Sequence, residues 1–269
     1  MSRISTLFFS CVVLCLLGTN AWADGVEHSA PTPCCDTASF AGAYIGGAVG
    51  YGSQRVEVDN LSLGTSFNDR DSSVTFGGYV GYNFQRCCSP FVFGIETDFN
   101  YLNTSPTALD IEPPGPGGLP ETTSLESNID WFGTLRGRAG FVVHNNLLLY
   151  ATGGLAYASV DHTLSDDCVL CGNSLLNYGQ FSQSNDKTKV GWTIGGGGEL
   201  LHDSHWVLRA EALYVDLGSE THSYSVSDPI GVNPFIANAV AKWDDQFWVA
   251  RLGVAYKFGD SDCCAAPLK

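Results

Sequence analysis

Two histidines lie close in sequence to hydroxyl and carboxylate groups, the combination that nucleophilic catalysis requires. The candidate sets are His162 with Ser159, and His222 with Ser219, Glu220 and Ser223. A serine nucleophile needs a base within hydrogen-bond reach and a third group that orients the base. Both sets fall in polar stretches, where a histidine is usually solvated. The chain also has no phosphate-binding loop and no metal-binding histidine pair. We therefore expect no enzymatic activity, no cofactor and no metal site.

A second set of reactive side chains consists of charges that alternate with apolar residues. It comprises four acids and five bases: Glu96, Asp98, Arg136, Arg138, Glu199, Arg209, Glu211, Arg251 and Lys257. An alternation with period two places the charged and the apolar side chains on opposite faces of a strand. If the charged face is buried, the near balance of acids and bases supplies each charge with a partner. We expect these residues to form one charge network.

Eight segments share this alternation and must position the charges. They cover approximately residues 40–58, 72–85, 91–103, 127–143, 147–160, 188–201, 205–217 and 244–258. In the last segment, for example, Leu252 lies on an apolar face opposite Arg251. In the segment 127–143, the alternation predicts Ile129 on the apolar face and Asp130 on the charged face.

The lengths of the connections indicate how these strands are arranged. Residues 86–90, 144–146 and 202–204 form short turns, whereas residues 59–71, 104–125, 161–186 and 218–243 form long loops. Short turns at one end and long loops at the other, with an even number of strands, are typical of bacterial outer-membrane barrels. The prolines and glycines between Thr104 and Leu125 predict a loop without regular structure. We predict an all-β fold, an eight-stranded antiparallel transmembrane β-barrel over residues 40–258.

The two ends of the chain are predicted to lie outside the barrel. Arg3 precedes an apolar run over residues 4–17, and Ala21, Trp22 and Ala23 form an A-x-A cleavage site. This pattern predicts a signal peptide over residues 1–23. Periplasmic segments are then expected over residues 24–39 and 259–269. No later stretch is long and apolar enough to form a membrane-spanning helix.

Eight cysteines remain after removal of the signal peptide. They are Cys34, Cys35, Cys87, Cys88, Cys168, Cys171, Cys263 and Cys264. An even number of cysteines in an exported protein indicates disulfides. In the predicted barrel the three adjacent pairs lie on the periplasmic side, and the other two lie in an external loop. Cross-links between protomers or to a periplasmic partner are the alternative, and a metal site is disfavoured because adjacent cysteines have poor ligand spacing.

Several motifs in these strands resemble those of a known family. They are Y-I-G-G-A-V-G-Y (44–51), F-G-G-Y-V-G-Y-N-F (76–84), G-I-E-T-D-F (94–99), W-F-G-T-L-R-G-R-A-G (131–140), Y-A-T-G-G-L-A-Y (150–157) and V-A-R-L-G-V-A-Y-K-F (249–258). The chain is similar to the small OmpA-type outer-membrane barrels of Gram-negative bacteria, the porin-like surface immunogenic proteins. The resemblance implies insertion by the barrel-assembly machinery, which recognises an aromatic-ended last strand. Tyr256 and Phe258 match that signal.

The predicted function is structural. A narrow eight-stranded barrel is filled by its own side chains, so the lumen is expected to be plugged and its charges paired. External loops would present an acidic surface for envelope integrity and for contact with a host or phage ligand, while the wall contacts outer-membrane lipid and lipopolysaccharide. A narrow or gated porin-like channel for small solutes is the alternative, and an enzyme acting on lipid A is a third class. The net charge of −15 argues against nucleic acid as a partner.

Overall fold

The computed structural model describes most of the segments that were expected to form the barrel. The described residues are 38–60, 65–112, 121–144, 146–166, 181–203, 205–226 and 237–259. The predicted signal peptide (1–23), nearly all of the segment 24–39, and residues 260–269 of the predicted tail lie outside this set. Within the described ranges, no helix is long and apolar enough to cross a membrane.

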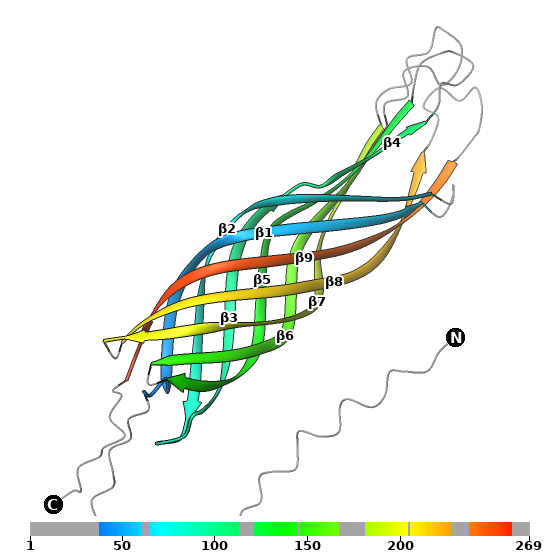
Figure 1. Ribbon diagram of the computed structural model, residues 1–269. Coiled ribbons are helices and arrows are strands. Elements are labelled where there is room, and N and C mark those ends of the chain that lie inside the picture. Colours follow the sequence, from blue (N-terminus) through cyan, green and yellow to red (C-terminus); the bar gives the residue numbers. More distant parts are fainter. Residues whose placement is uncertain are drawn as a thin grey trace, which may run out of the picture. The chain divides into compact units, whose positions relative to one another are not determined.

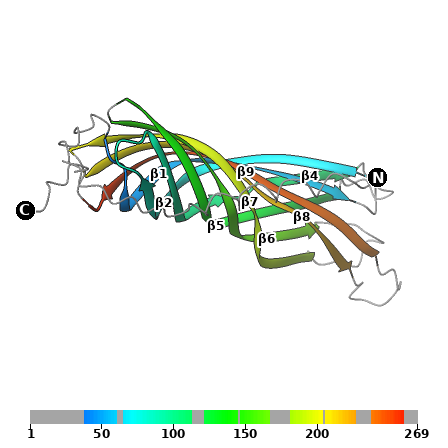
Figure 2. The ribbon, with the colours of Figure 1, turned by 90° about the horizontal axis from the view of Figure 1, so that it is seen from below.

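The described residues form one antiparallel sheet that closes on itself (Figure 1, Figure 2). Its strands are β1 (Gly42–Asn60), β2 (Thr65–Gln85), β3 (Phe91–Thr104), β4 (Thr107–Glu112), β5 (Glu121–His144), β6 (Leu147–Asp166), β7 (Phe181–His202), β8 (Trp206–Val226) and β9 (Ala237–Lys257). β1 pairs with β9, which closes the barrel. Both β3 and β4 pair with β5, so β4 continues β3 and the nine strands make an eight-stranded barrel. The predicted fold class is confirmed.

The strands extend further toward the long loops than the sequence predicted. β2, for example, begins at Thr65 rather than Ser72, and β7 begins at Phe181 rather than Thr188. The expectation of a structureless segment between Thr104 and Leu125 is wrong at both ends. There β4 pairs with the start of β5, at the end of the barrel away from the short turns (Figure 1). The prolines and glycines cluster at residues 113–120, outside the described set, whereas the flanking residues include β-branched side chains that favour strands.

The outward face of the barrel carries a continuous apolar surface that ends in aromatic rings. Leu252 is 66% exposed and Trp248 60%, whereas Arg251 between them is buried. We call the ring of aromatic side chains toward the long loops the outer girdle: Tyr101, Trp131, Tyr157, Trp192, Tyr214 and Trp248. Within it, Trp131 contacts Tyr157, and Tyr214 contacts both Trp192 and Trp248. The inner girdle lies near the short turns and includes Tyr82, Phe84, Phe91, Phe141, Trp206, Tyr256 and Phe258.

One predicted face assignment is wrong. Ile129 is buried inside the barrel, and Asp130 is exposed on its outer surface. The register between β5 and β6 shifts between Ile129 and Trp131, which marks a β-bulge at Asp130. A bulge inserts one residue into the alternation, so the side chains on its two sides exchange faces. Trp131 therefore still points outward, into the outer girdle.

Candidate functional site

The interior of the barrel contains all nine charged residues that the sequence singled out. Each is at most 5% exposed, and they come from β3, β5, β7, β8 and β9. Three ion pairs join residues that lie directly opposite each other on neighbouring strands: Glu96 with Arg136, Glu199 with Arg209, and Glu211 with Arg251. The strand register alone therefore places these acids beside their bases. Their side chains meet because all of them point to the same face of the closed sheet.

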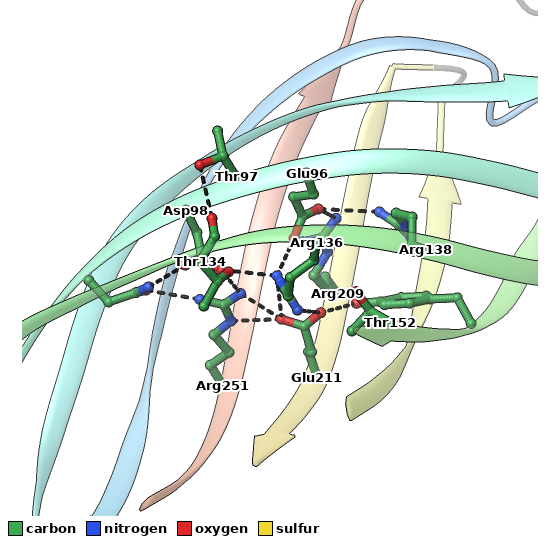
Figure 3. Close-up of polar contacts among 12 residues, drawn as sticks. Glu96, Thr97, Asp98, Thr134, Arg136, Arg138, Thr152, Arg209, Glu211 and Arg251 are labelled. Carbon is green, nitrogen blue, oxygen red and sulfur yellow. Dashed lines mark hydrogen bonds and ion pairs between the residues drawn. The ribbon is translucent and has the colours of Figure 1, made fainter. Parts of the chain in front are cut away.

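Arg136 lies at the centre of this cluster (Figure 3). Its Nη2 atom is 2.5 Å from Glu96 Oε1 and 3.0 Å from Asp98 Oδ2. Its Nη1 atom is 3.0 Å from Glu211 Oε1. Arg251 bridges the same two strands from the other side, with Nη2 2.7 Å from Asp98 Oδ2 and 2.6 Å from Glu211 Oε2. The two guanidinium groups thus hold the carboxylates of β3 and β8 together across the lumen.

Arg138 and Arg209 complete the cluster toward the short turns. Arg209 Nη2 lies 2.7 Å from Glu96 Oε2 and 2.6 Å from Glu199 Oε1. Arg138 Nη2 lies 2.8 Å from the same Glu199 oxygen, and its Nη1 is 3.3 Å from Glu96 Oε2. We call these four arginines and four acids the central network; its members are Glu96, Asp98, Arg136, Arg138, Glu199, Arg209, Glu211 and Arg251. Its formal charge is zero.

Buried tyrosines add contacts that the sequence did not predict. The hydroxyl of Tyr44 donates to Glu96 Oε2 at 2.6 Å, and that of Tyr150 donates to Glu211 Oε1 at 2.9 Å. The guanidinium carbon of Arg138 lies 4.0 Å from the centre of the Tyr150 ring, within the range of a cation–π contact. The alternation along the sequence was the one signal that could have indicated these contacts, because it places Tyr44 and Tyr150 on the inward-facing positions of β1 and β6.

Lys257 is buried but lies nearer to the short turns than the central network. Its Nζ donates to the carbonyl oxygen of Gly259 at 3.4 Å. Together with Phe40, Glu199 and Arg209 it lines an enclosed cavity of about 10 Å³. A space of that size holds about one water molecule. This cavity thus brings Lys257 close to Glu199 and Arg209 of the charge cluster.

Two apolar layers lie on either side of the central network. The inner layer, near the short turns, includes Phe40, Tyr44, Tyr79, Val92, Val142, Leu148, Tyr150, Leu201, Val207 and Ala255. The outer layer includes Leu102, Ile129, Phe132, Ala156, Ala158, Val160, Val215, Leu217, Phe247 and Val249. Phe132 and Phe247 meet edge to face across the lumen, with ring centres 5.1 Å apart. The charges are therefore enclosed by hydrocarbon along the barrel axis as well as by the wall.

A second buried polar cluster lies beyond the outer apolar layer, and the sequence did not predict it. Asp245 accepts hydrogen bonds from Ser127 Oγ (2.8 Å) and Lys189 Nζ (2.7 Å), and its Oδ2 is 3.0 Å from His162 Nε2. His162 is only 2% exposed and stacks on Trp243, with ring centres 4.4 Å apart. The expectation that His162 is solvated is wrong, because β6 continues past the girdle and turns this side chain inward.

The structure does not assemble the two candidate catalytic sets. Ser159 points outward and lies 3.3 Å from Asp186, whereas His162 on the same strand points inward. Ser219 and Ser223 are exposed on the face of β8 opposite to His222. No group of three or more His, Cys, Asp or Glu among the described residues is placed to hold a metal ion.

Two of the eight candidate cysteines, Cys87 and Cys88, lie among the described residues. Cys88 is disulfide-bonded, while the neighbouring Cys87 is exposed and free. Both lie in the turn after β2, where adjacent side chains point in different directions. The other six candidate cysteines lie outside the described residues: Cys34, Cys35, Cys168, Cys171, Cys263 and Cys264.

The two aromatic residues of the predicted assembly signal lie side by side. Tyr256 and Phe258 are on the outward face of the barrel in the inner girdle, with ring centres 5.2 Å apart.

Comparison with known proteins gives consistent matches along the chain. A family model described as "Outer membrane protein beta-barrel domain" matches residues 9–258. The 31 kDa outer-membrane immunogenic protein of Brucella melitensis is 34% identical over 260 residues, covering 91% of this chain and 97% of that protein. The 22 kDa outer membrane protein of Rhizobium leguminosarum is 30% identical over 192 residues, covering 71% and 70%. Among solved structures, the outer membrane protein OprG of Pseudomonas aeruginosa has a TM-score of 0.45 at 14% identity, covering 83% of this chain and 99% of that one.

Proposed function

We propose that this chain, which belongs to the outer membrane protein beta-barrel domain family and is an outer-membrane protein, is a structural barrel with a closed lumen. Its role is to span the membrane as a rigid wall and to present an acidic surface outside the cell. The outward apolar belt contacts the acyl chains of outer-membrane lipid and lipopolysaccharide. We also propose that the aromatic end of β9 is the signal read by the barrel-assembly machinery.

The observation that carries the proposal is the central network. Four arginines and four carboxylates are paired at 2.5–3.3 Å across the lumen. Separating one of these pairs would leave a buried charge without its partner, at a cost of roughly 3–5 kcal/mol. An aqueous path through the barrel would require several such separations at once. Opening the network is therefore strongly disfavoured.

The apolar layers support the same conclusion independently. Even if the charged side chains moved apart, an ion would still meet Phe132 and Phe247 on one side and Phe40 and Leu148 on the other. All four side chains are at most 1% exposed. An ion must keep its hydration shell or find polar partners, and hydrocarbon side chains provide neither.

The surface role is supported by the strands that continue past the outer girdle. Exposed acidic residues occupy this region on several strands, among them Asp130 on β5 and Asp186 on β7. The Brucella relative is named an outer-membrane immunogenic protein, and this name supports the proposed surface role. A protein that anchors such a surface needs a stable wall and no passage through it.

Swelling of proteoliposomes tests the closed lumen. Liposomes containing the refolded mature protein should swell in an isotonic solution of a small sugar no faster than protein-free liposomes. A general porin, reconstituted at the same protein-to-lipid ratio, serves as the positive control. Faster swelling that declines with increasing solute size would replace the structural proposal with the porin-like channel.

A further inference from the structure

The polar cluster outside the outer girdle contains a direct contact between two histidine rings. We call it the outer polar cluster and define it as His162, Lys189, Glu220, His222 and Asp245, from strands β6 to β9. His162 Nδ1 is 3.4 Å from His222 Nε2, while its other ring nitrogen is 3.0 Å from Asp245. His222 Nε2 is also 3.7 Å from Glu220 Oε2. The two imidazoles therefore link a carboxylate of β9 to one of β8.

The position of this cluster separates it from the membrane and from the central network. On β9, Asp245 lies three residues beyond Trp248 of the outer girdle, and Phe247 and Val249 of the outer apolar layer lie between Asp245 and Arg251. His162 lies five residues beyond Tyr157 on β6. The cluster thus stands on the extracellular side, where it can exchange protons with the medium. It is independent of the lumen closure proposed above.

Charged side chains of both signs face the histidine pair. β7 contributes Lys189 and the more exposed Lys187, which forms an ion pair with Glu220 of β8. β9 contributes Asp245. Two uncharged side chains also contact the cluster: Ser127 from β5, which donates to Asp245, and Trp243, which stacks on His162. Among the described residues, charged groups of both signs therefore surround the two rings.

The contact between the rings also restricts how many protons the pair can hold. A neutral imidazole has one donor and one acceptor nitrogen, whereas both nitrogens of an imidazolium are donors. At 3.4 Å, a proton on one ring can be shared with the acceptor nitrogen of the other. If both rings are charged, two N–H groups point at each other and the contact is repulsive. The observed arrangement is therefore available only while at least one ring is neutral.

We propose that the His162–His222 pair is a pH-sensitive latch, which holds the outer ends of β6, β8 and β9 together at neutral pH and releases them in acid. Release separates β8 from β6 beyond the outer girdle and leaves the membrane-spanning wall intact. The ligand of this site is the proton, and the medium outside the cell supplies it.

The direction of the pH effect follows from the environment of His222. Burial, followed by the positive charges of His162 and the two lysines, lowers the pKa of His222 from its ordinary value of 6.5 in the closed cluster, against the opposing effect of Glu220. In the released state the ring is solvated and recovers its ordinary pKa. The released state thus binds the proton more tightly. The free energy that favours the closed cluster is therefore greatest above pH 6.5, and it decreases as the pH falls below 6.5.

Hydrogen exchange measured by mass spectrometry tests the latch. The full mature protein in lipid nanodiscs, with EDTA present throughout, is compared at pH 7.5 and pH 5.5, after correction for the intrinsic pH dependence of exchange. Above pH 5.5 the carboxylates remain largely ionised, so the histidines dominate the titration. Peptides from the outer parts of β6, β8 and β9 should exchange several-fold faster at pH 5.5, up to about tenfold for each unit of pKa difference. Peptides around Arg136 should not change.

Three variants separate the latch from other effects of acid. His162→Gln and His222→Gln each remove one imidazole and should abolish the pH response of the outer peptides. His202→Gln changes an exposed residue at the end of β7, at the other end of the barrel, and should leave the response unchanged. Wild-type protein whose outer peptides exchange equally at both pH values would overturn the proposal, whatever the variants do. An undiminished response in both cluster variants would also overturn it.

Discussion

The arginines of the lumen have more than one carboxylate partner each, which makes every one of them important for stability. Arg136 contacts Glu96, Asp98 and Glu211, and its side chain is completely buried. In such a network the cost of removing one member comes mainly from the charges that remain without a partner. The structure therefore predicts large effects from single substitutions inside the barrel and small effects from substitutions outside it.

Substitution of Arg136 by methionine tests this expectation. Three carboxylates would then share the remaining arginines, and we expect a loss of roughly 3–5 kcal/mol in the free energy of unfolding. Arg55→Met is the matched control, because Arg55 pairs with Glu57 on the surface and both side chains are about half exposed. It should cost at most about 1 kcal/mol. Urea unfolding in lipid vesicles, followed by tryptophan fluorescence, measures both. Similar losses for the two variants would contradict the network account.

At the scale of the strands, tyrosine rings that cover glycines stabilise the sheet. Tyr157 lies directly opposite Gly133, and a Cβ atom on Gly133 would come within 2.5 Å of the tyrosine ring. Tyr44 with Gly81 and Tyr79 with Gly46 repeat this arrangement inside the barrel. An aromatic ring packed over a glycine protects the backbone and fixes the register of the two strands. These contacts explain why glycines and tyrosines recur together in the motifs of the chain.

A pair of glycine variants distinguishes this packing from a general effect of glycine on the strand. Gly133→Ala forces the Tyr157 ring out of its position, and overpacking of this kind costs roughly 1–3 kcal/mol. Gly137→Ala, four residues along the same strand, adds a methyl group with no atom nearer than 4.0 Å. It should be neutral or slightly stabilising. The midpoint of urea unfolding reports both values, and equal midpoints would show that the Tyr157 contact contributes nothing.

The last strand allows a separate prediction about assembly. Phe258 packs against Tyr256 on the outward face, where the proposed assembly signal lies. We expect Phe258→Ala to insert several-fold more slowly into vesicles that contain the barrel-assembly machinery, but at the wild-type rate into vesicles of lipid alone. Phe91→Ala serves as the control, because Phe91 also belongs to the inner girdle, lies on β3 and is similarly exposed. Equal slowing of both variants would assign the effect to lost lipid contact.

The sequence predicts strands well wherever the alternation is unbroken. On β9 every residue from Trp248 to Lys257 points to its predicted face, because period two follows from strand geometry alone. The prediction failed at Ile129, since the bulge at Asp130 leaves no mark in the order of apolar and polar residues. The prediction also made several strands too short at their ends toward the long loops. Polar residues outside the membrane pair as strands when a neighbouring strand continues beside them, and a single sequence does not reveal that neighbour.

At the scale of the whole barrel, contacts across the lumen depend on how the sheet closes. Three ion pairs of the central network follow from neighbouring strands, so an approximate strand alignment is enough to anticipate them. The contact between His162 and Asp245 joins residues that are 83 positions apart on strands that are not neighbours. It requires the register of every intervening pair. The central network could therefore be foreseen from residue types, whereas the outer polar cluster could not.

In the proposed closed barrel, three layers along the axis exclude water. The inner and outer apolar layers present hydrocarbon, and the central network between them presents paired charges. Removing one charged side chain opens only one of these layers. We therefore expect the lumen to remain closed even in single charge variants whose folded state is destabilised.

Single-channel conductance in a planar lipid bilayer measures whether ions pass through the lumen. The refolded mature protein and an Arg138→Ala variant are each incorporated and recorded in concentrated salt. The layered lumen predicts no steady conductance from the wild type, and none from Arg138→Ala, because both apolar layers remain in place. Discrete openings in the wild type that become larger in Arg138→Ala would contradict the account and would identify the central network as a gate.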